Sequence, residues 1–257
     1  MQHKIIFFDV DGTLTSYKDG TISTATKQAL AKLKKNGFII VAATGRPFSM
    51  CHELIALGID TFITANGGYV IHKNRCIHKI KMNQNIVQQV SHFALQQQHA
   101  LTYYSHILQM NTIQTPIVQQ ALYETLGLCT FPPIAQNNDS LETYLLCLFV
   151  TDEQLAPYKK QFPALTFRRW HTNIVNVLER NVSKSDAIMQ VLQHFGLSNT
   201  QAIAFGDGNN DIDMLQIADI GIAMGNATEN LKAISNFVTE DSHEDGIVLA
   251  LKHYKLI

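Results

Sequence analysis

Short apolar runs recur at both ends of the chain, and most of them are followed by a pattern of helical period, while Thr61–Thr64 and Tyr69–His72 flank the turn signal Asn66-Gly67-Gly68. Uninterrupted apolar runs of this length are typical of strands that are buried on both faces of a parallel sheet. The predicted strands are Lys4–Phe8, Phe38–Ala43, Thr61–Thr64, Tyr69–His72, Ala202–Phe205 and Ile220–Ala223. Strands and helices that alternate in this way predict an α/β fold with a mostly parallel sheet and helices on both faces.

The predicted helices carry start and stop signals. Ser23 is a suitable N-cap for a helix that runs to about Asn36, where Gly37 ends it. Pro47 is predicted to open a second helix, because the first helical position needs no N–H donor. Further helices are predicted from Lys184 onward and over Asn210–Ile217.

The middle of the chain has a different character. Residues 82–177 are rich in Gln and are predicted to form helix, strand, helix, loop, strand, helix, strand and strand in that order. The loop is placed near residues 131–140, which hold two prolines and the pair Asn137-Asn138. We therefore predict a core domain made of residues 1–81 and 178–257, with residues 82–177 inserted into it as a smaller α+β domain.

Composition excludes several classes of protein. The formal net charge is -1, and no basic cluster indicates a nucleic-acid partner. The four cysteines lie far apart, which favours scattered thiols over a zinc site or a disulfide framework. The apolar run near Met1 is too short for a signal peptide, and no apolar stretch reaches the length of a membrane span. We expect a cytoplasmic protein without a membrane partner; its oligomeric state is left open.

Polar motifs follow the predicted strands, where ligands of open α/β sheets bind. Asp9 and Asp11 come directly after the first strand and are followed by Gly12. Two carboxylates so close together repel each other when desolvated, and a divalent cation or a shared proton normally resolves that repulsion. Taken alone, this fragment fits an ordinary Asx-turn equally well.

Three further pieces add oxygen and nitrogen ligands. Thr44 and Gly45 follow the second strand, where a hydroxyl and an open backbone suit a phosphate. Lys184 stands at a helix start, a position that the helix dipole disfavours unless an anion lies nearby. Asp207 and Asp211 flank a strand-to-helix turn and suit Mg²⁺. Each piece has an ordinary structural explanation, but all of them together favour a phosphoryl-transfer site.

The motifs resemble those of a known family. The stretches FFDVDGTLT, VAATGRP, RNVSKSDA and AFGDGNNDIDML are similar to the four motifs of the haloacid dehalogenase superfamily. The stretches Ile222–Ala227 and His243–Gly246 resemble its Cof-type phosphatase subgroup. The resemblance covers roughly residues 1–81 and 178–257. It implies a Rossmann-like core, an α/β cap placed by position and length alone at residues 82–177, and hydrolysis of small phosphorylated metabolites.

The resemblance also implies a role for each motif residue. Asp9 would be the nucleophile that carries the phosphoryl group, and Asp11 the general acid and base. Mg²⁺ would be held by Asp9, by the backbone carbonyl of Asp11 and by Asp207. The phosphoryl oxygens would be bound by Thr44, Gly45 and Lys184, with Asn210 in support. The remaining motif residues would brace the site: Gly12, Thr13 and Asp211.

Two other functions stay open on the sequence. A phosphomutase of the same superfamily would share the first motif, although the last motif favours the phosphatases. A phospho-accepting signalling module is disfavoured, because an acid at Asp11 speeds loss of the phosphoryl group. The substrate is not specified, and sugar phosphates, nucleotides and cofactor phosphates all fit. Within the insertion, Asn173 and Asn176 are candidates for a substrate contact. The alternative is that both side chains stabilise turns or face the solvent.

Overall fold

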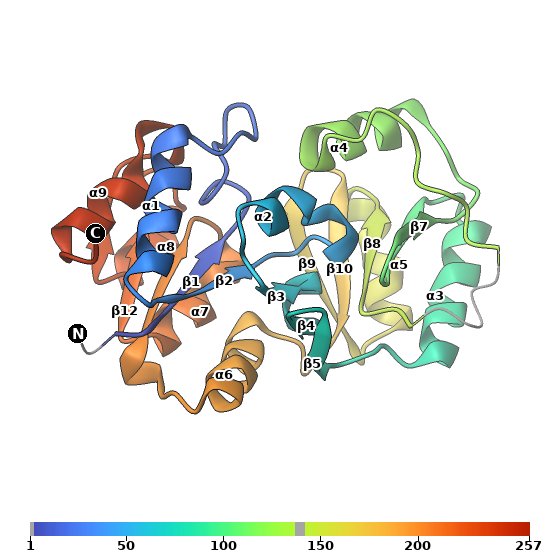
Figure 1. Ribbon diagram of the computed structural model, residues 1–257. Coiled ribbons are helices and arrows are strands. Elements are labelled where there is room, and N and C mark those ends of the chain that lie inside the picture. Colours follow the sequence, from blue (N-terminus) through green and yellow to red (C-terminus); the bar gives the residue numbers. More distant parts are fainter. Residues whose placement is uncertain (1–2, 137–141) are drawn as a thin grey trace. The chain divides into compact units, whose positions relative to one another are not determined.

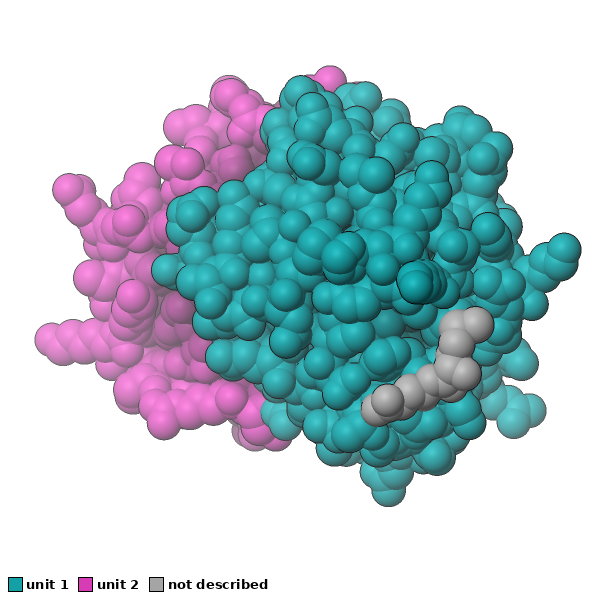
Figure 2. Space-filling model, turned by 90° about the vertical axis from the view of Figure 1, so that its left-hand side faces the viewer, with its two compact units in different colours: residues 1–45, 51–79, 183–257 teal, residues 46–50, 80–182 magenta. Residues whose placement is uncertain are grey.

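The computed structural model describes residues 3–136 and 142–257. The chain divides into two compact units (Figures 1 and 2). The first contains residues 1–45, 51–79 and 183–257, and the second contains residues 46–50 and 80–182. The insertion expected at residues 82–177 falls within the second unit. The pair Asn137-Asn138, predicted to lie in a loop, is outside the described residues.

The first unit is built on a mostly parallel sheet. Within the described residues this sheet has eight strands in the order β13-β12-β11-β1-β2-β3-β4-β5, and only β4 runs antiparallel to its neighbours, β3 and β5. The strands are β1 Ile5–Asp9, β2 Ile39–Ala43, β3 Thr61–Thr64, β4 Tyr69–His72, β5 Arg75–Lys79, β11 Ala202–Gly206, β12 Ile220–Ala223 and β13 Phe237–Val238. The predicted α/β class is therefore confirmed.

Helices cover the strands of the first unit (Figure 1). Helices α1 and α9 contact each other, and α6 contacts α7. The helices are α1 Thr24–Lys35, α2 His52–Ala56, α6 Lys184–Phe195, α7 Ile212–Ile217, α8 Glu229–Ile234 and α9 Gly246–His253. As predicted, Ser23 caps α1: its side chain accepts a hydrogen bond from the backbone N–H of Thr26. None of the described helices is long and apolar enough to cross a lipid bilayer.

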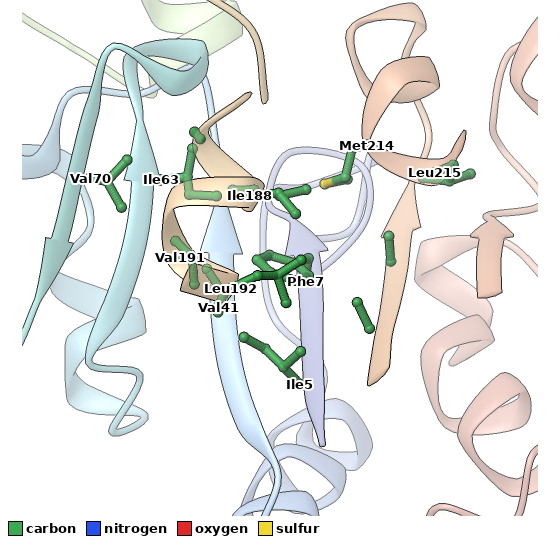
Figure 3. Close-up of a cluster of buried hydrophobic side chains, with 14 of the residues drawn as sticks. Ile5, Phe7, Val41, Ile63, Val70, Ile188, Val191, Leu192, Met214 and Leu215 are labelled. Atoms are coloured by element: carbon green, nitrogen blue, oxygen red, sulfur yellow. The ribbon is translucent and has the colours of Figure 1, made fainter. Parts of the chain in front are cut away.

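The buried core fixes the position of α6. Ile188, Val191 and Leu192 of this helix belong to the same buried cluster as Ile5 and Phe7 of β1 (Figure 3). Each such side chain contributes about 1.5–3 kcal/mol when fully buried. This packing holds the first residue of α6 in place, even where that residue is costly to bury.

The strand order creates a topological switch point at β1. Its parallel neighbours are β2 on one side and β11 on the other, with Asp9 opposite Ala43 in the register. The chain leaves β1 toward β2 and later returns to the opposite side at β11. Loops diverge at such a point, so a crevice forms beyond the carboxyl ends of the strands. The motif residues after β1, β2 and β11 follow this edge.

The second unit is built on an antiparallel sheet. Within the described residues its strand order is β7-β6-β8-β10-β9, and each neighbouring pair is antiparallel. The strands are β6 Leu101–Tyr104, β7 Leu108–Met110, β8 Leu145–Phe149, β9 Leu165–His171 and β10 Ile174–Glu179. The helices are α3 Gln84–Gln96, α4 Pro116–Leu126 and α5 Asp152–Gln161. Side chains of α3 and α5 share one buried cluster with the sheet.

Several predicted elements differ from the structure. The helix predicted to open at Pro47 is a 3₁₀ turn over Phe48–Met50, and α2 begins only at His52. The helix predicted from Asn210 likewise begins with a 3₁₀ turn, and α7 starts at Ile212. Strands β5, β7 and β13 were not predicted. All three are edge strands, β5 is largely exposed and β13 has only two residues, so none carries the apolar run that marks a central strand.

Candidate active site

Asp9 ends the central strand and is almost completely buried. It is 5% exposed, and its Oδ1 accepts a hydrogen bond from Lys184 Nζ at 2.5 Å. Burial raises the pKa of Asp9 well above its ordinary value, and repulsion from Asp211 raises it further, while Lys184 opposes both effects. A buried carboxylate at this position requires nearby positive charge in order to stay ionised.

Lys184 supplies part of that charge. It is the first residue of α6 and is 1% exposed, and its Nζ also donates to Asp211 Oδ1 at 2.6 Å. Burial alone would lower the pKa of Lys184, but Asp211 and Asp9 outweigh burial and raise it. The lysine is therefore charged, and it stands at an unfavourable helix end because two carboxylates hold it there.

The turn after β11 positions two further carboxylates. Asp211 is fully buried, and its Oδ2 accepts hydrogen bonds from the backbone N–H groups of Asp207 and Gly208, at 3.1 and 3.0 Å. Both oxygens of Asp211 are thus engaged within the protein. Asp207 Oδ1 accepts from the Thr13 hydroxyl at 3.2 Å. Burial, with repulsion from Asp211, raises the pKa of Asp207 to about 7.

Gly12 allows the loop after β1 to approach the loop after β11, which contains Asp207. Its φ is +85°, a conformation that glycine adopts without strain. A Cβ at this position would overlap the Asp207 carboxylate. Any larger residue would therefore push Asp207 away from the loop that follows Asp9. This explains in physical terms why the motif has glycine after Asp11.

The other predicted site residues lie in loops at the same edge of the sheet. Thr44 is buried just after β2; its backbone N–H donates to the Ile63 carbonyl, and its own carbonyl accepts from the Asn66 N–H. Gly45 lies so close to the Asn66 side chain that a Cβ on it would be 3.2 Å from Nδ2. Asp11 and Asn210 are exposed: Asp11 lies in the loop after β1, and Asn210 lies in the 3₁₀ turn that follows β11.

The carboxylates suit a hard divalent cation. Ligand oxygens of Asp9, Asp207 and Asp211 lie within 4.8 Å of one another, and Asp207 is the only one of the three that is partly exposed. Three carboxylates against the one positive charge of Lys184 leave an excess of negative charge, which a cation with oxygen ligands would neutralise. Because Asp211 is already fully hydrogen-bonded, Asp9 and Asp207 are the side chains better placed to hold a metal ion. The residues present therefore fit Mg²⁺.

One residue at this edge received no role from the sequence. Asn226 follows β12, the next strand beyond β11, and its Nδ2 donates to the Gly12 carbonyl at 2.9 Å. The signal for it was available, because β12 is parallel to β11 and ends at the same edge of the sheet. It was overlooked because an amide has no obvious chemistry of its own.

With this geometry established, comparison with known proteins identifies the family. The family model of the haloacid dehalogenase-like hydrolases matches residues 6–251, and the chain belongs to that family. The resemblance to the Cof-type subgroup that was predicted from the sequence is confirmed, and so is the enzyme class, a phosphoric monoester hydrolase.

Individual relatives span the whole chain. YkrA of Bacillus subtilis, whose name assigns it provisionally to the phosphatases, is 33% identical over 100% of both chains. The solved structure of the HAD subclass IIB sugar phosphatase BT4131 is 31% identical, covers 99% of this chain and 100% of its own, and has a TM-score of 0.88. YitU of Bacillus subtilis, named a 5-amino-6-(5-phospho-D-ribitylamino)uracil phosphatase, is 26% identical over 97% of both chains.

Proposed function

We propose that the chain is a Mg²⁺-dependent phosphatase that transfers the phosphoryl group of a small metabolite to Asp9 and then to water. The observation that carries this proposal is the contact of Lys184 with Asp9 and Asp211, beside Asp207, at the switch point of the sheet. Phosphate monoesters hydrolyse very slowly without a catalyst, so positioning and charge stabilisation must supply most of the rate. This cluster provides both.

Each residue of the site has a defined task in the proposal. Asp9 attacks phosphorus and breaks the bond to the leaving oxygen, so that the phosphoryl group resides on its carboxylate. Lys184 and Thr44 hold the phosphoryl oxygens, with Gly45 and Asn210 in support. When bound by Asp9, Asp207 and the carbonyl of Asp11, Mg²⁺ supplies positive charge at the phosphoryl oxygens.

Asp11 is the general acid and base of the proposed reaction. Its side chain is exposed, whereas Asp9 is buried, so the two carboxyl groups experience different surroundings. Asp11 gives a proton to the leaving oxygen in the first step and takes one from the attacking water in the second. The second step breaks the bond between phosphorus and Asp9, and the free carboxylate is restored.

The proposal predicts release of inorganic phosphate from some members of a panel of phosphorylated metabolites. With Mg²⁺ present, the best substrate should give phosphate and a free alcohol; with excess EDTA, turnover should cease, and added Mg²⁺ should restore it. Phosphate release would be measured colorimetrically, and ³¹P NMR would detect an isomeric phosphate ester. Turnover unaffected by EDTA would refute the metal dependence, and an isomer without free phosphate would indicate a phosphomutase.

Selection of the leaving group requires contacts beyond the phosphate site. We assign these contacts to the second unit, because the motif residues contact only phosphate and metal in the proposed mechanism. One row of register partners in its sheet is polar: Thr102, Cys147, Asn176 and Arg168 face one another on β6, β8, β10 and β9. Polar groups are costly to bury without a purpose, so this row is the candidate for contact with a hydroxyl-bearing leaving group.

Asn176 is the central member of the row. Its Oδ1 accepts hydrogen bonds from Trp170 Nε1 at 2.8 Å and from the Cys147 thiol at 3.2 Å. Its Nδ2 has no hydrogen bond to any other described residue and is available as a donor. Asn173, the other candidate from the sequence, lies in the turn between β9 and β10, where its backbone N–H donates to His171. Asn176 is therefore the better candidate for a substrate contact.

If the polar row contacts the leaving group, Asn176→Leu should weaken binding of the substrate but not binding of inorganic phosphate. KM for the best substrate should rise about tenfold, the effect of losing one net hydrogen bond. Inhibition by inorganic phosphate should not change, because phosphate lacks the leaving group. Asn173→Ala, in the adjoining turn, is the matched control and should leave both constants unaltered. Equal weakening of phosphate and substrate by Asn176→Leu would contradict a role in leaving-group selection.

A further inference from the structure

The side chain of Asn226 links three loops of the first unit. Its Nδ2 donates to the Gly12 carbonyl at 2.9 Å and lies 3.4 Å from Asp207 Oδ2, while its Oδ1 accepts from the backbone N–H of Ser242 at 2.8 Å. Donor and acceptor thus each meet a complementary partner, which fixes the orientation of the amide. The loops after β1, β11 and β13 are held together by this one side chain.

The turn at residues 224–228, which contains Asn226, also holds Asp207 through main-chain hydrogen bonds. The N–H of Thr228, two residues after Asn226, donates to the Asp207 carbonyl at 2.9 Å. The N–H of Met224, two residues before it, donates to the carbonyl of Gly206 at 3.0 Å. The turn at 224–228 therefore fixes the carbonyls of two consecutive residues, Gly206 and Asp207, and Asn226 adds a side-chain contact to the carboxylate itself.

The third loop is itself anchored to the segment that follows the first motif. The backbone N–H of Tyr17 donates to the Ser242 hydroxyl at 3.1 Å, and the Ser23 hydroxyl donates to Asp245 Oδ1 at 2.6 Å. The loop at 241–245 is thus a fixed support rather than a free end. Asn226 connects that support to Gly12 and Asp207.

We infer that Asn226 is a positioning residue for the metal site: it ties the Gly12 carbonyl, next to the proposed ligand carbonyl of Asp11, to the Asp207 carboxylate. This inference rests on the proposed function, since the metal belongs to that proposal. The Gly12 contact fixes the residue that adjoins Asp11, whose carbonyl is a proposed ligand. Partners that orient metal ligands in this way typically account for about 10–100-fold in metal affinity.

The test is calorimetric titration of Mg²⁺ into the full chain without substrate. Asn226→Ala should raise the Kd for Mg²⁺ by about tenfold or more. At saturating Mg²⁺, KM for the best substrate should stay at the wild-type value. Asn236→Ala is the matched control, because the Asn236 side chain also accepts from a backbone N–H, that of Gly221 at 2.7 Å, at the other end of β12. It should bind Mg²⁺ like the wild type.

The outcomes separate the two proposals. If the wild type binds no Mg²⁺, the proposed function fails. If the wild type binds Mg²⁺ and Asn226→Ala binds it equally well, the positioning role of Asn226 is wrong. Circular dichroism would establish that the variant is folded; should Asn226→Ala not fold, Asn226→Ser, which also lacks the reach to Gly12, is measured in its place. An equal loss of affinity in Asn236→Ala would likewise overturn the inference.

Discussion

Asp9→Asn is expected to abolish phosphate release, with a loss of at least about 10⁴-fold, the scale seen when a covalent nucleophile is removed. The amide can still accept the hydrogen bond from Lys184 Nζ, so the fold should persist. It is neither a competent nucleophile nor an anionic metal ligand. Acid quench during turnover, followed by mass spectrometry, should detect a phosphoryl group on the wild type and none on the variant.

Asp11→Asn is the matched comparison, since the same chemical change is made two residues away. It should lower kcat by about 10²–10⁴-fold through loss of acid–base catalysis. Mg²⁺ binding should persist, because the proposal uses the backbone carbonyl of Asp11 rather than its side chain. Wild-type turnover in Asp9→Asn would disprove the nucleophile, and loss of Mg²⁺ binding in Asp11→Asn would disprove the division of roles.

Lys184→Met is expected to reduce both activity and stability. The lysine is 1% exposed and contacts Asp9 and Asp211, so its removal leaves two buried carboxylates without their cation. Removing one partner of a buried ion pair typically costs about 3–5 kcal/mol of unfolding free energy. Urea unfolding in EDTA would measure this loss. Added Mg²⁺ should recover part of it, because the cation replaces some of the missing positive charge.

Lys232→Met provides the control for that experiment. Lys232 pairs with Glu229 at 3.1 Å on the surface, where the Glu229 side chain is 90% exposed. Exposed pairs of this kind contribute about 0–1 kcal/mol, so the free energy of unfolding should change little. If Lys184→Met were no more destabilising than Lys232→Met, the buried ion pairs would not carry the structural role assigned to them.

Several strands of the first sheet, and the motifs that follow them, are evident from local sequence patterns. β3, β4 and β12 were predicted with their observed bounds, because β3 and β4 flank the turn Asn66-Gly67-Gly68 and β12 is a short apolar run. A strand buried on both faces is largely apolar, as β1 is along Ile5–Phe8, and this pattern is visible locally. The motif positions followed, since the carboxyl ends of parallel strands share one edge of the sheet.

Features that depend on contacts between distant parts of the chain became visible only in the folded protein. Strand β5 pairs at the sheet edge through its backbone, and its exposed side chains carry no periodic signal. The ion pairs of Lys184 join residues that lie 175 and 27 positions away. The amide of Asn226 acquires its role only where Gly12, Asp207 and Ser242 converge on it. Local sequence patterns show which residues will be buried. Which side chains contact each other across loops depends on the assembled sheet, because the sheet brings the ends of its strands together.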